Sequence, residues 1–145
     1  MYNVDTSRIE RQLLYLQTCL DVLRGVHDLA HTTDQFAAAR ALHVAIECVT
    51  DVGNALIDGF IMRDPGSYED IVEILYDEKV LAKEEAVPIK RLVECRRLLV
   101  INYTEVDKET LMQLLEAVPA LARFPQRVEA YLKQELGPNA LTFHA

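Results

Sequence analysis

The sequence is poor both in residues that interrupt helices and in residues that favour sheets. Its 145 residues include no Trp, only five Gly and only five Pro. Leu, Ala, Val, Glu and Arg are abundant instead, and this composition favours helices over strands. Half of the residues are apolar, which excludes the composition of a disordered chain. The length suits a single domain.

Positive charge is also scarce. Fifteen Lys and Arg residues stand against twenty-three Asp and Glu residues, which gives a net charge of −8. The surface as a whole therefore repels phosphate backbones and anionic membranes, so we expect no DNA binding, and any RNA binding needs a local basic site. No apolar run reaches the roughly 18 residues of a membrane span, and the first residues lack the apolar core of a signal peptide. We expect a cytoplasmic protein with no membrane partner.

The cysteines are few and unpaired in the sequence. Cys19, Cys48 and Cys95 are odd in number, widely spaced and without a C-x-x-C motif. Each falls within a helical apolar pattern, so we interpret them as free thiols of the core. We expect neither a metal nor a cofactor.

Apolar residues recur at helical spacing along most of the chain. The first stripe alternates steps of four and three: Ile9, Leu13, Leu16, Leu20 and Leu23. Five helical segments are predicted: from Asp5 or Ser7 to about 24, from Thr33 or Asp34 to about Phe60, from Ser67 to about Tyr76, from about Lys83 to Tyr103, and from Asp107 to about 136. The prediction is an all-α antiparallel bundle of four to six helices in one domain, residues 1–136. Residues 137–145 are expected to be a loose tail.

Two local features refine this prediction. The second segment carries an apolar stripe that begins at Phe36, and its small residues permit close approach of another helix; they are Ala38, Ala41, Ala45 and Gly53. In the last segment, Pro119 and Pro125 should kink or divide the helix. Pro88 is tolerable only if it lies in the first turn of its segment.

The most informative position is Arg96. In the fourth predicted segment it has the helical phase that Ile89, Leu92 and Leu99 occupy, so its guanidinium should turn inward. A buried guanidinium needs a carboxylate or another acceptor. The second segment offers a polar stripe at spacings of four, three and four, formed by Glu47, Asp51, Asn54 and Asp58. Glu47 or Asp51 is the predicted partner of Arg96. The alternative is an ordinary solvated helix face.

Arg96 also belongs to a local basic cluster. Lys90, Arg91, Arg96 and Arg97 are four basic residues within eight. One interpretation is a helix exterior balanced by neighbouring glutamates. The other is an anchor for phosphate or RNA.

At this segment the sequence resembles a known family. Residues 96–103 read RRLLVINY. They resemble the signature of HepT-like proteins of the HEPN superfamily, in which Arg, a polar residue, two or three apolar residues, His, any residue and Tyr follow one another. The resemblance extends to Val4-Asp5, to the acidic stripe of the second segment and to residues 61–65, as in one subgroup of the family. It covers the chain to about residue 135.

The resemblance implies both an activity and partners. It implies a HEPN-like bundle that forms a homodimer through the signature region, and a minimal nucleotidyltransferase as antitoxin. It implies metal-free RNA cleavage, in which Arg96 holds the phosphate while a His assists attack of the 2′-hydroxyl. The position of that His is Ile101, which cannot move a proton. Tyr103 stands where the partner attaches adenylate to a Tyr.

Some assignments have alternatives. Tyr103 is either this modification site or the end of an apolar stripe, with its ring buried and its hydroxyl in water. His43 lies one turn before Glu47. It either projects into a polar groove between the second and fourth segments, where it could replace the missing base, or has a structural role. His27, His31 and His144 are weaker candidates. Arg24 and His31 match part of the signature spacing by accident.

Three functions remain open from the sequence. The first is an RNA-targeting toxin component with Arg96 as phosphate contact and Glu47 or Asp51 orienting it. The second is a catalytically silent relative that binds RNA, nucleotide or partner. The third is an interaction protein in which the polar groove is only a buried network that fixes helix register.

Overall fold

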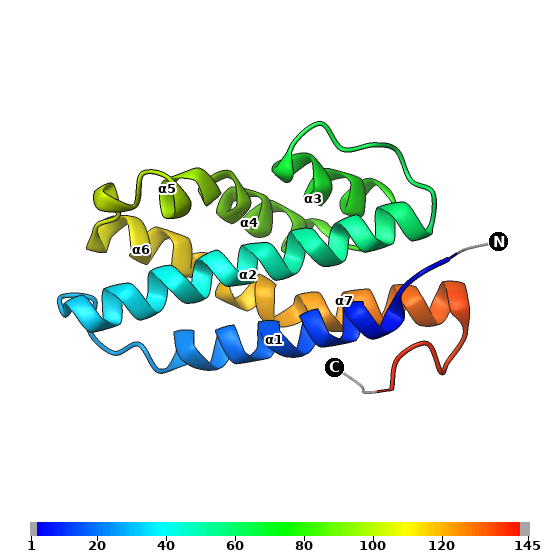
Figure 1. Cartoon of the computed structure of the whole chain (residues 1–145), viewed down its shortest axis with the longest axis horizontal. Coiled ribbons are helices and arrows are strands. Elements are labelled where there is room, and N and C mark those ends of the chain that lie inside the picture. The colour runs from blue at the N-terminus through cyan, green and yellow to red at the C-terminus, as the bar shows by residue number, and fades with distance from the viewer. Residues whose placement is uncertain (1–2, 143–145) are drawn as a thin grey trace.

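Four long helices form the frame of the molecule in the computed structural model, which describes residues 3–142. They are α1 (Thr6–Arg24), α2 (Thr32–Gly59), α4 (Lys83–Glu94) and α7 (Val118–Leu136). Successive long helices run in opposite directions along the bundle (Figure 1). The short elements between them are α3 (Tyr68–Asp77), α5 (Arg96–Val100), η1 (Tyr103–Glu105), α6 (Lys108–Leu114) and η2 (Leu115–Ala117). Residues 3–142 contain no strand, so the predicted all-α antiparallel bundle is confirmed.

The helix ends follow local chemistry in most places. The Asp5 carboxylate accepts a hydrogen bond from the Arg8 amide at 3.0 Å and caps α1, as predicted. The predicted cap of α2 is wrong. Asp34 lies inside the first turn, and its carboxylate instead accepts bonds from the amides of His27 and Asp28 at 3.2 and 2.9 Å. Asp34 therefore closes the turn between α1 and α2.

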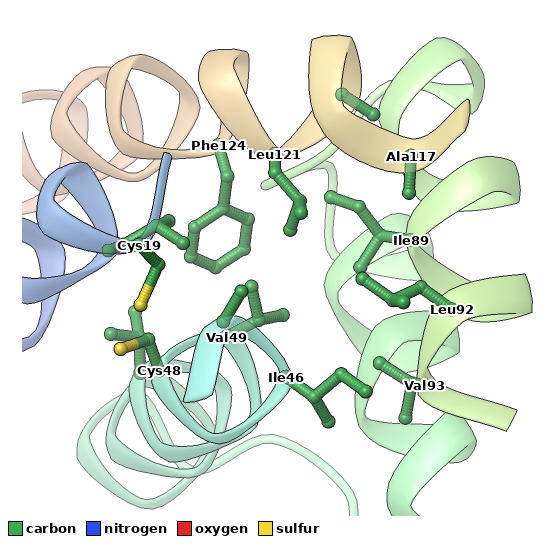
Figure 2. Packing of buried hydrophobic residues seen from close by; sticks show 14 of the residues in the cluster. Cys19, Ile46, Cys48, Val49, Ile89, Leu92, Val93, Ala117, Leu121 and Phe124 are labelled. Atoms are coloured by element: carbon green, nitrogen blue, oxygen red, sulfur yellow. The ribbon is translucent and has the colours of Figure 1, made fainter. Parts of the chain in front are cut away.

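The predicted apolar stripes meet in one core. Figure 2 shows Phe124 and Leu121 of α7 between Cys19 of α1, Val49 of α2 and Ile89 of α4. The predicted stripe of α1, from Ile9 to Leu23, is buried along its whole length. Phe36 is the exception on α2, because its ring is 73% exposed.

Two of the predicted core thiols face one another. Cys19 and Cys48 are buried and free, and they meet between α1 and α2 (Figure 2). A hydrogen bond between them lowers the pKa of Cys19 and raises that of Cys48, which burial raises further. Cys95 is half-buried at the end of α4.

Small residues of α2 are used inside the bundle. Ala38, Ala41 and Ala45 are buried, and a Cβ on Gly53 would lie 2.4 Å from Cγ2 of Ile71. Glycine at this position lets α3 approach α2 closely. The face is therefore not available to a second subunit.

The prolines follow the prediction in part. Pro119 is the second residue of α7, where a proline is tolerated, and the chain divides just before it, at η2. Pro125 lies inside α7 without ending it. Pro88 lies beyond the first turn of α4. A proline there leaves the carbonyl of Glu84 without its helical donor, and Arg123 Nη2 donates to that oxygen at 3.4 Å.

The predicted loose tail is partly ordered. α7 ends at Leu136, and Gly137 follows with φ of +101°, as the Gly-Pro stop signal predicts. Leu141 is buried, and the amide of Thr142 donates to the Glu10 carboxylate of α1 at 3.2 Å. Residues 137–142 therefore return to the bundle, whereas His144 lies outside the described residues.

Candidate functional site

The signature segment leaves the line of α4. The predicted helix from Lys83 to Tyr103 ends at Glu94, turns at Cys95 and starts again as α5 at Arg96. α5 packs against α2 and ends at Val100. The residues that resemble the family signature thus form a short helix followed by a 3-10 turn.

Arg96 turns toward α2 and forms the predicted ion pair with Glu47. Its Nε donates to Glu47 Oε1 at 2.9 Å, and the two side chains are 28% and 31% exposed. The guanidinium also lies over the ring of Tyr68, with Cζ 4.1 Å from the ring centroid. Its terminal nitrogens form no hydrogen bond within residues 3–142. Arg96 is therefore held at one edge and open at the other.

Asp51, the alternative partner, does not reach Arg96. It is exposed one turn further along α2, and no ion pair or hydrogen bond among the described residues joins it to the guanidinium. Partial burial raises the pKa of Asp51, and the charge of Glu47 adds to this effect.

The position of Tyr68 follows from the connection between α2 and α3. The Ser67 hydroxyl accepts a bond from the Asp70 amide at 3.1 Å and caps α3, as predicted. Arg63 holds the Asp70 carboxylate at 2.8 Å, and the Gly66 amide donates to it at 2.9 Å. These contacts lower the pKa of Asp70 to about 2. They fix the start of α3 and so place the Tyr68 ring under Arg96.

His43 joins the same carboxylate from the other side. Its Nε2 lies 3.2 Å from Glu47 Oε1, and its Nδ1 lies 3.4 Å from Nη1 of Arg40. Because a guanidinium can only donate, Nδ1 accepts from Arg40, and Nε2 therefore carries the proton donated to Glu47. Glu47 thus receives hydrogen bonds from both His43 and Arg96, and the His43 lone pair points toward Arg40.

A groove of about 270 Å³ opens beside His43. It lies between the first half of α2 and the segment from α5 to α6, and its lining residues are Gln35, Phe36, Ala39, Arg40, His43, Leu99, Tyr103, Val106 and Leu111. No acidic side chain is among these residues. The groove is therefore mainly apolar and aromatic, with a basic edge.

The end of the signature is exposed. Tyr103 lies in η1 with 68% of its surface accessible, so the interpretation that buries its ring is wrong. Ile101, at the position of the family's His, is 57% exposed and does not line the groove. Tyr103 and His43 contribute to one groove, and Ile101 does not.

The basic cluster is spread over several directions. Lys90 pairs with Glu73 of α3 at 3.1 Å, which raises the Lys90 pKa. Arg91 lines a separate groove between α4 and the segment α6–η2, and Arg97 is exposed. Only Arg96 among the four reaches the network on Glu47.

Two groups of the site were not identified from the sequence. Arg40 lies three residues before His43, so the spacing alone would have placed it on the same helix face. Tyr68 has no comparable signal, because only the folded loop from Arg63 to Ser67 brings it to Arg96. Residues 3–142 contain no group of three or more His, Cys, Asp or Glu side chains suited to a metal ion. None of the described helices is long and apolar enough to cross a membrane.

Comparison with known proteins defines the class of this fold and site. A family model described as ribonuclease HepT-like matches residues 14–128, and the chain belongs to this family.

The relatives include one close sequence from Bacillus subtilis, named "Putative RNase YutE". It is 44% identical over 139 residues, which cover 95% of this chain and 96% of the relative. The solved structure of YutE, described as a cytosolic protein of unknown function, has a TM-score of 0.90 at 42% identity and covers 97% of this chain and 100% of YutE. A "Putative RNase" from Archaeoglobus fulgidus is 29% identical over 129 residues, or 88% of this chain and 97% of that protein.

One further solved structure shares the fold at low identity. It is described as a toxin-antitoxin with AMP-PNP, and it has a TM-score of 0.76 at 16% identity. The match covers 84% of this chain and 97% of the other. At this identity the likeness establishes the fold.

Proposed function

We propose that the chain is the RNA-targeting component of a toxin–antitoxin pair whose other member is a minimal nucleotidyltransferase, acting in the cytoplasm without a metal or cofactor. The observation that carries the proposal is the arrangement of Arg96. Glu47 and Tyr68 fix its guanidinium, while its terminal nitrogens remain open. A fixed guanidinium with two free donor nitrogens suits a phosphate of the RNA backbone. Membership of the HepT-like family supports RNA as the ligand.

For cleavage, His43 takes the role that Ile101 cannot perform. A phosphate bound by Arg40 and Arg96 draws Arg40 away from His43 Nδ1, whose lone pair then accepts the proton of the ribose 2′-hydroxyl. The 2′-oxygen bonds to phosphorus, and the bond from phosphorus to the 5′-oxygen breaks. That oxygen takes a proton from a water molecule, and the hydroxide that remains takes the proton held by His43 Nδ1. The products are a 2′,3′-cyclic phosphate and a 5′-hydroxyl. Glu47 steadies His43 through Nε2 throughout.

Exposure of Ile101 favours a second candidate function. With an apolar, exposed side chain at the position of the family's His, the chain binds RNA, nucleotide or partner without cutting. The electrostatic contact by Arg96 and Arg97 survives this substitution, because it needs no proton transfer.

Incubation of purified protein with transfer RNA separates the two candidates. Cleavage by the wild type that is lost in His43→Gln and in Arg96→Gln supports the first. Absence of cleavage in the wild type, with activity in Ile101→His, supports the second. No cleavage and no salt-dependent binding by any variant would contradict both. His27→Gln is the matched control, since the His27 side chain is exposed and does not line the groove.

The proposed partner acts on Tyr103. Its exposed ring can enter another enzyme's active site, and adenylate attached to its hydroxyl would place a negative charge beside the groove. Mass spectrometry after incubation with ATP and the nucleotidyltransferase should find adenylate on Tyr103 and none in Tyr103→Phe. We also propose a homodimer in which the signature regions of two copies lie near the twofold axis, so that their grooves meet and Tyr103 stays accessible. Light scattering of the purified protein tests this assembly.

A further inference from the structure

We propose that the groove between α2 and η1 is a binding pocket for one unpaired RNA base, held between the rings of Phe36 and Tyr103. This inference rests on the proposed function, since it assigns a subsite to the same RNA ligand. It joins Tyr103, at the end of the signature segment, to residues of α2 that lie outside that segment.

Two exposed aromatic rings line the groove. Phe36 and Tyr103 are 73% and 68% exposed, yet both line one groove from elements far apart in the sequence. Exposed aromatic rings cost free energy in water, and they are the usual platforms on which proteins stack unpaired bases. The other apolar residues that line the groove are Ala39, Leu99, Val106 and Leu111.

The groove is small. Its volume of about 270 Å³ lies just below the range of small-molecule pockets, roughly 300–1,000 Å³. It therefore suits a single planar ring system better than a whole nucleotide or a peptide helix.

The groove differs in charge from the protein as a whole. The protein carries a net charge of −8, but no acidic side chain lines this groove. Arg40 and His43 form its polar edge, and no ion pair among the described residues joins Arg40 to a carboxylate. An anionic backbone attached to the base would be attracted at this edge and repelled elsewhere on the surface.

The groove is linked through His43 to Arg96, the proposed phosphate contact. His43 lines the groove and shares Glu47 Oε1 with Arg96. A base in the groove would therefore place its ribose near His43 and an adjoining phosphate near Arg96. Binding of the base would orient the 2′-hydroxyl that the proposed reaction uses.

Binding of short RNA with and without bases tests this pocket. The probe is a short, fluorescently labelled single strand with 2′-fluoro groups, so that it cannot be cut, together with an abasic strand of the same length and charge. The wild type should bind the strand with bases roughly tenfold more tightly, as one stacked base predicts. In Phe36→Leu the ratio of the affinities for the two strands should fall to about one, whereas Phe36→Trp should keep the wild-type ratio. Tyr76→Leu, which removes an exposed ring on α3, should change neither affinity.

The variants distinguish failure of the pocket from failure of the proposed function. Arg96→Gln should weaken binding of both strands, because each carries the phosphates. If the wild type binds both strands equally and Arg96→Gln weakens both, the pocket is wrong and RNA binding stands. If neither strand binds, both proposals are overturned. If Phe36→Leu instead changes the oligomeric state measured by light scattering, a second copy of the chain covers the ring, and the base pocket is wrong.

Discussion

The guanidinium of Arg96 lies over the ring of Tyr68, with Cζ 4.1 Å from the ring centroid. Arg96 begins α5 and Tyr68 begins α3, so this contact joins the first residues of two short helices. With Glu47 of α2 at 2.9 Å, the guanidinium of α5 is held by side chains from two other helices. This fixation, more than the presence of an Arg, makes the position suitable for binding phosphate.

Replacing Tyr68 tests this fixation. Tyr68→Leu removes the cation–π contact, which is worth about 0.5–1 kcal/mol at a partly exposed site. We expect a loss of stability of that size in urea unfolding and a severalfold loss of RNA affinity, because the guanidinium becomes less ordered. Tyr76→Leu on the same helix is the matched control. Equal RNA affinity of both variants would show that Tyr68 does not position Arg96.

Glu47→Gln separates the role of Glu47 in positioning Arg96 and His43 from its effect on the attraction of RNA to the site. The substitution removes a negative charge beside Arg96, so RNA binding should remain or become tighter and should depend more steeply on salt. Cleavage should fall by about tenfold or more, because the neutral amide oxygen of Gln accepts weaker hydrogen bonds from His43 and Arg96 and does not stabilise a protonated His43. The measurements are single-turnover cleavage and anisotropy titration at two salt concentrations.

The control for that experiment is Asp51→Asn, one turn further along α2. Asp51 makes no contact with Arg96, so its variant should resemble the wild type in cleavage. A parallel loss in both variants would indicate a general effect of the acidic stripe rather than the specific role of Glu47.

A second ion-pair network governs stability in acid. The Glu85 carboxylate is fully buried, and it accepts a hydrogen bond from Nε of Arg123 at 2.9 Å. It also forms an ion pair with Nε of Arg127 at 2.8 Å and accepts a longer hydrogen bond from Nη2 of the same residue at 3.4 Å. The Ala82 amide also donates to it, at 3.2 Å. Burial raises the pKa of Glu85, but the bonds from Arg123, Ala82 and Arg127 outweigh burial and the net pKa is lowered. The network joins the start of α4 to α7.

The lowered pKa sets the direction of the pH dependence. The unfolded chain binds a proton at Glu85 near its ordinary pKa of about 4.3, and the folded chain binds it only at lower pH. The contribution of Glu85 is therefore complete above that pH and is lost as the pH falls through the folded pKa. Glu85→Gln should be less stable by about 2 kcal/mol at neutral pH, and its free energy of unfolding should fall less steeply than that of the wild type as the pH is lowered. Glu84→Gln, which alters the exposed neighbour, should keep the wild-type profile in thermal unfolding from pH 7 to pH 3.

Close packing of α3 on α2 predicts a coupled pair of substitutions. Gly53→Ala places a methyl group 2.4 Å from Ile71 Cγ2, and such overpacking costs about 1–3 kcal/mol despite the better helix propensity of Ala. Ile71→Ala removes the obstructing atom and leaves a cavity. In the double variant the added methyl should partly fill that cavity, so the two losses should be less than additive. Additive losses in denaturant unfolding would indicate that α3 moves away instead.

Sequence reasoning located the central contact of the site because two periodic patterns converge there. The helical phase turned Arg96 inward, and the stripe that starts at Glu47 supplied an acceptor. The structure contains this pair at 2.9 Å. The bundle itself followed from the same periodicity, which predicted every buried position of the α1 stripe from Ile9 to Leu23.

The details that the sequence could not supply depend on tertiary contacts. No Gly or Pro marks Cys95, yet α4 ends there and α5 packs on α2. The sequence predicts one helix through Cys95 as far as Tyr103, and one of its two interpretations of Tyr103 buries the ring. In the structure Tyr103 is exposed. Phe36 has the phase of a core residue, but it lies near the start of α2 and lines an open groove instead. Periodicity assigns a residue to a helix face and does not reveal where the opposing helix ends.

The turn at Cys95 has a consequence for how this protein can change. Residues 96–106 lie outside the four long helices, and Ile101 among them is open to solvent. Replacing Ile101 by His should therefore leave the stability of the bundle nearly unchanged. Under the second candidate function, this one replacement supplies the proton acceptor without passing through a misfolded intermediate.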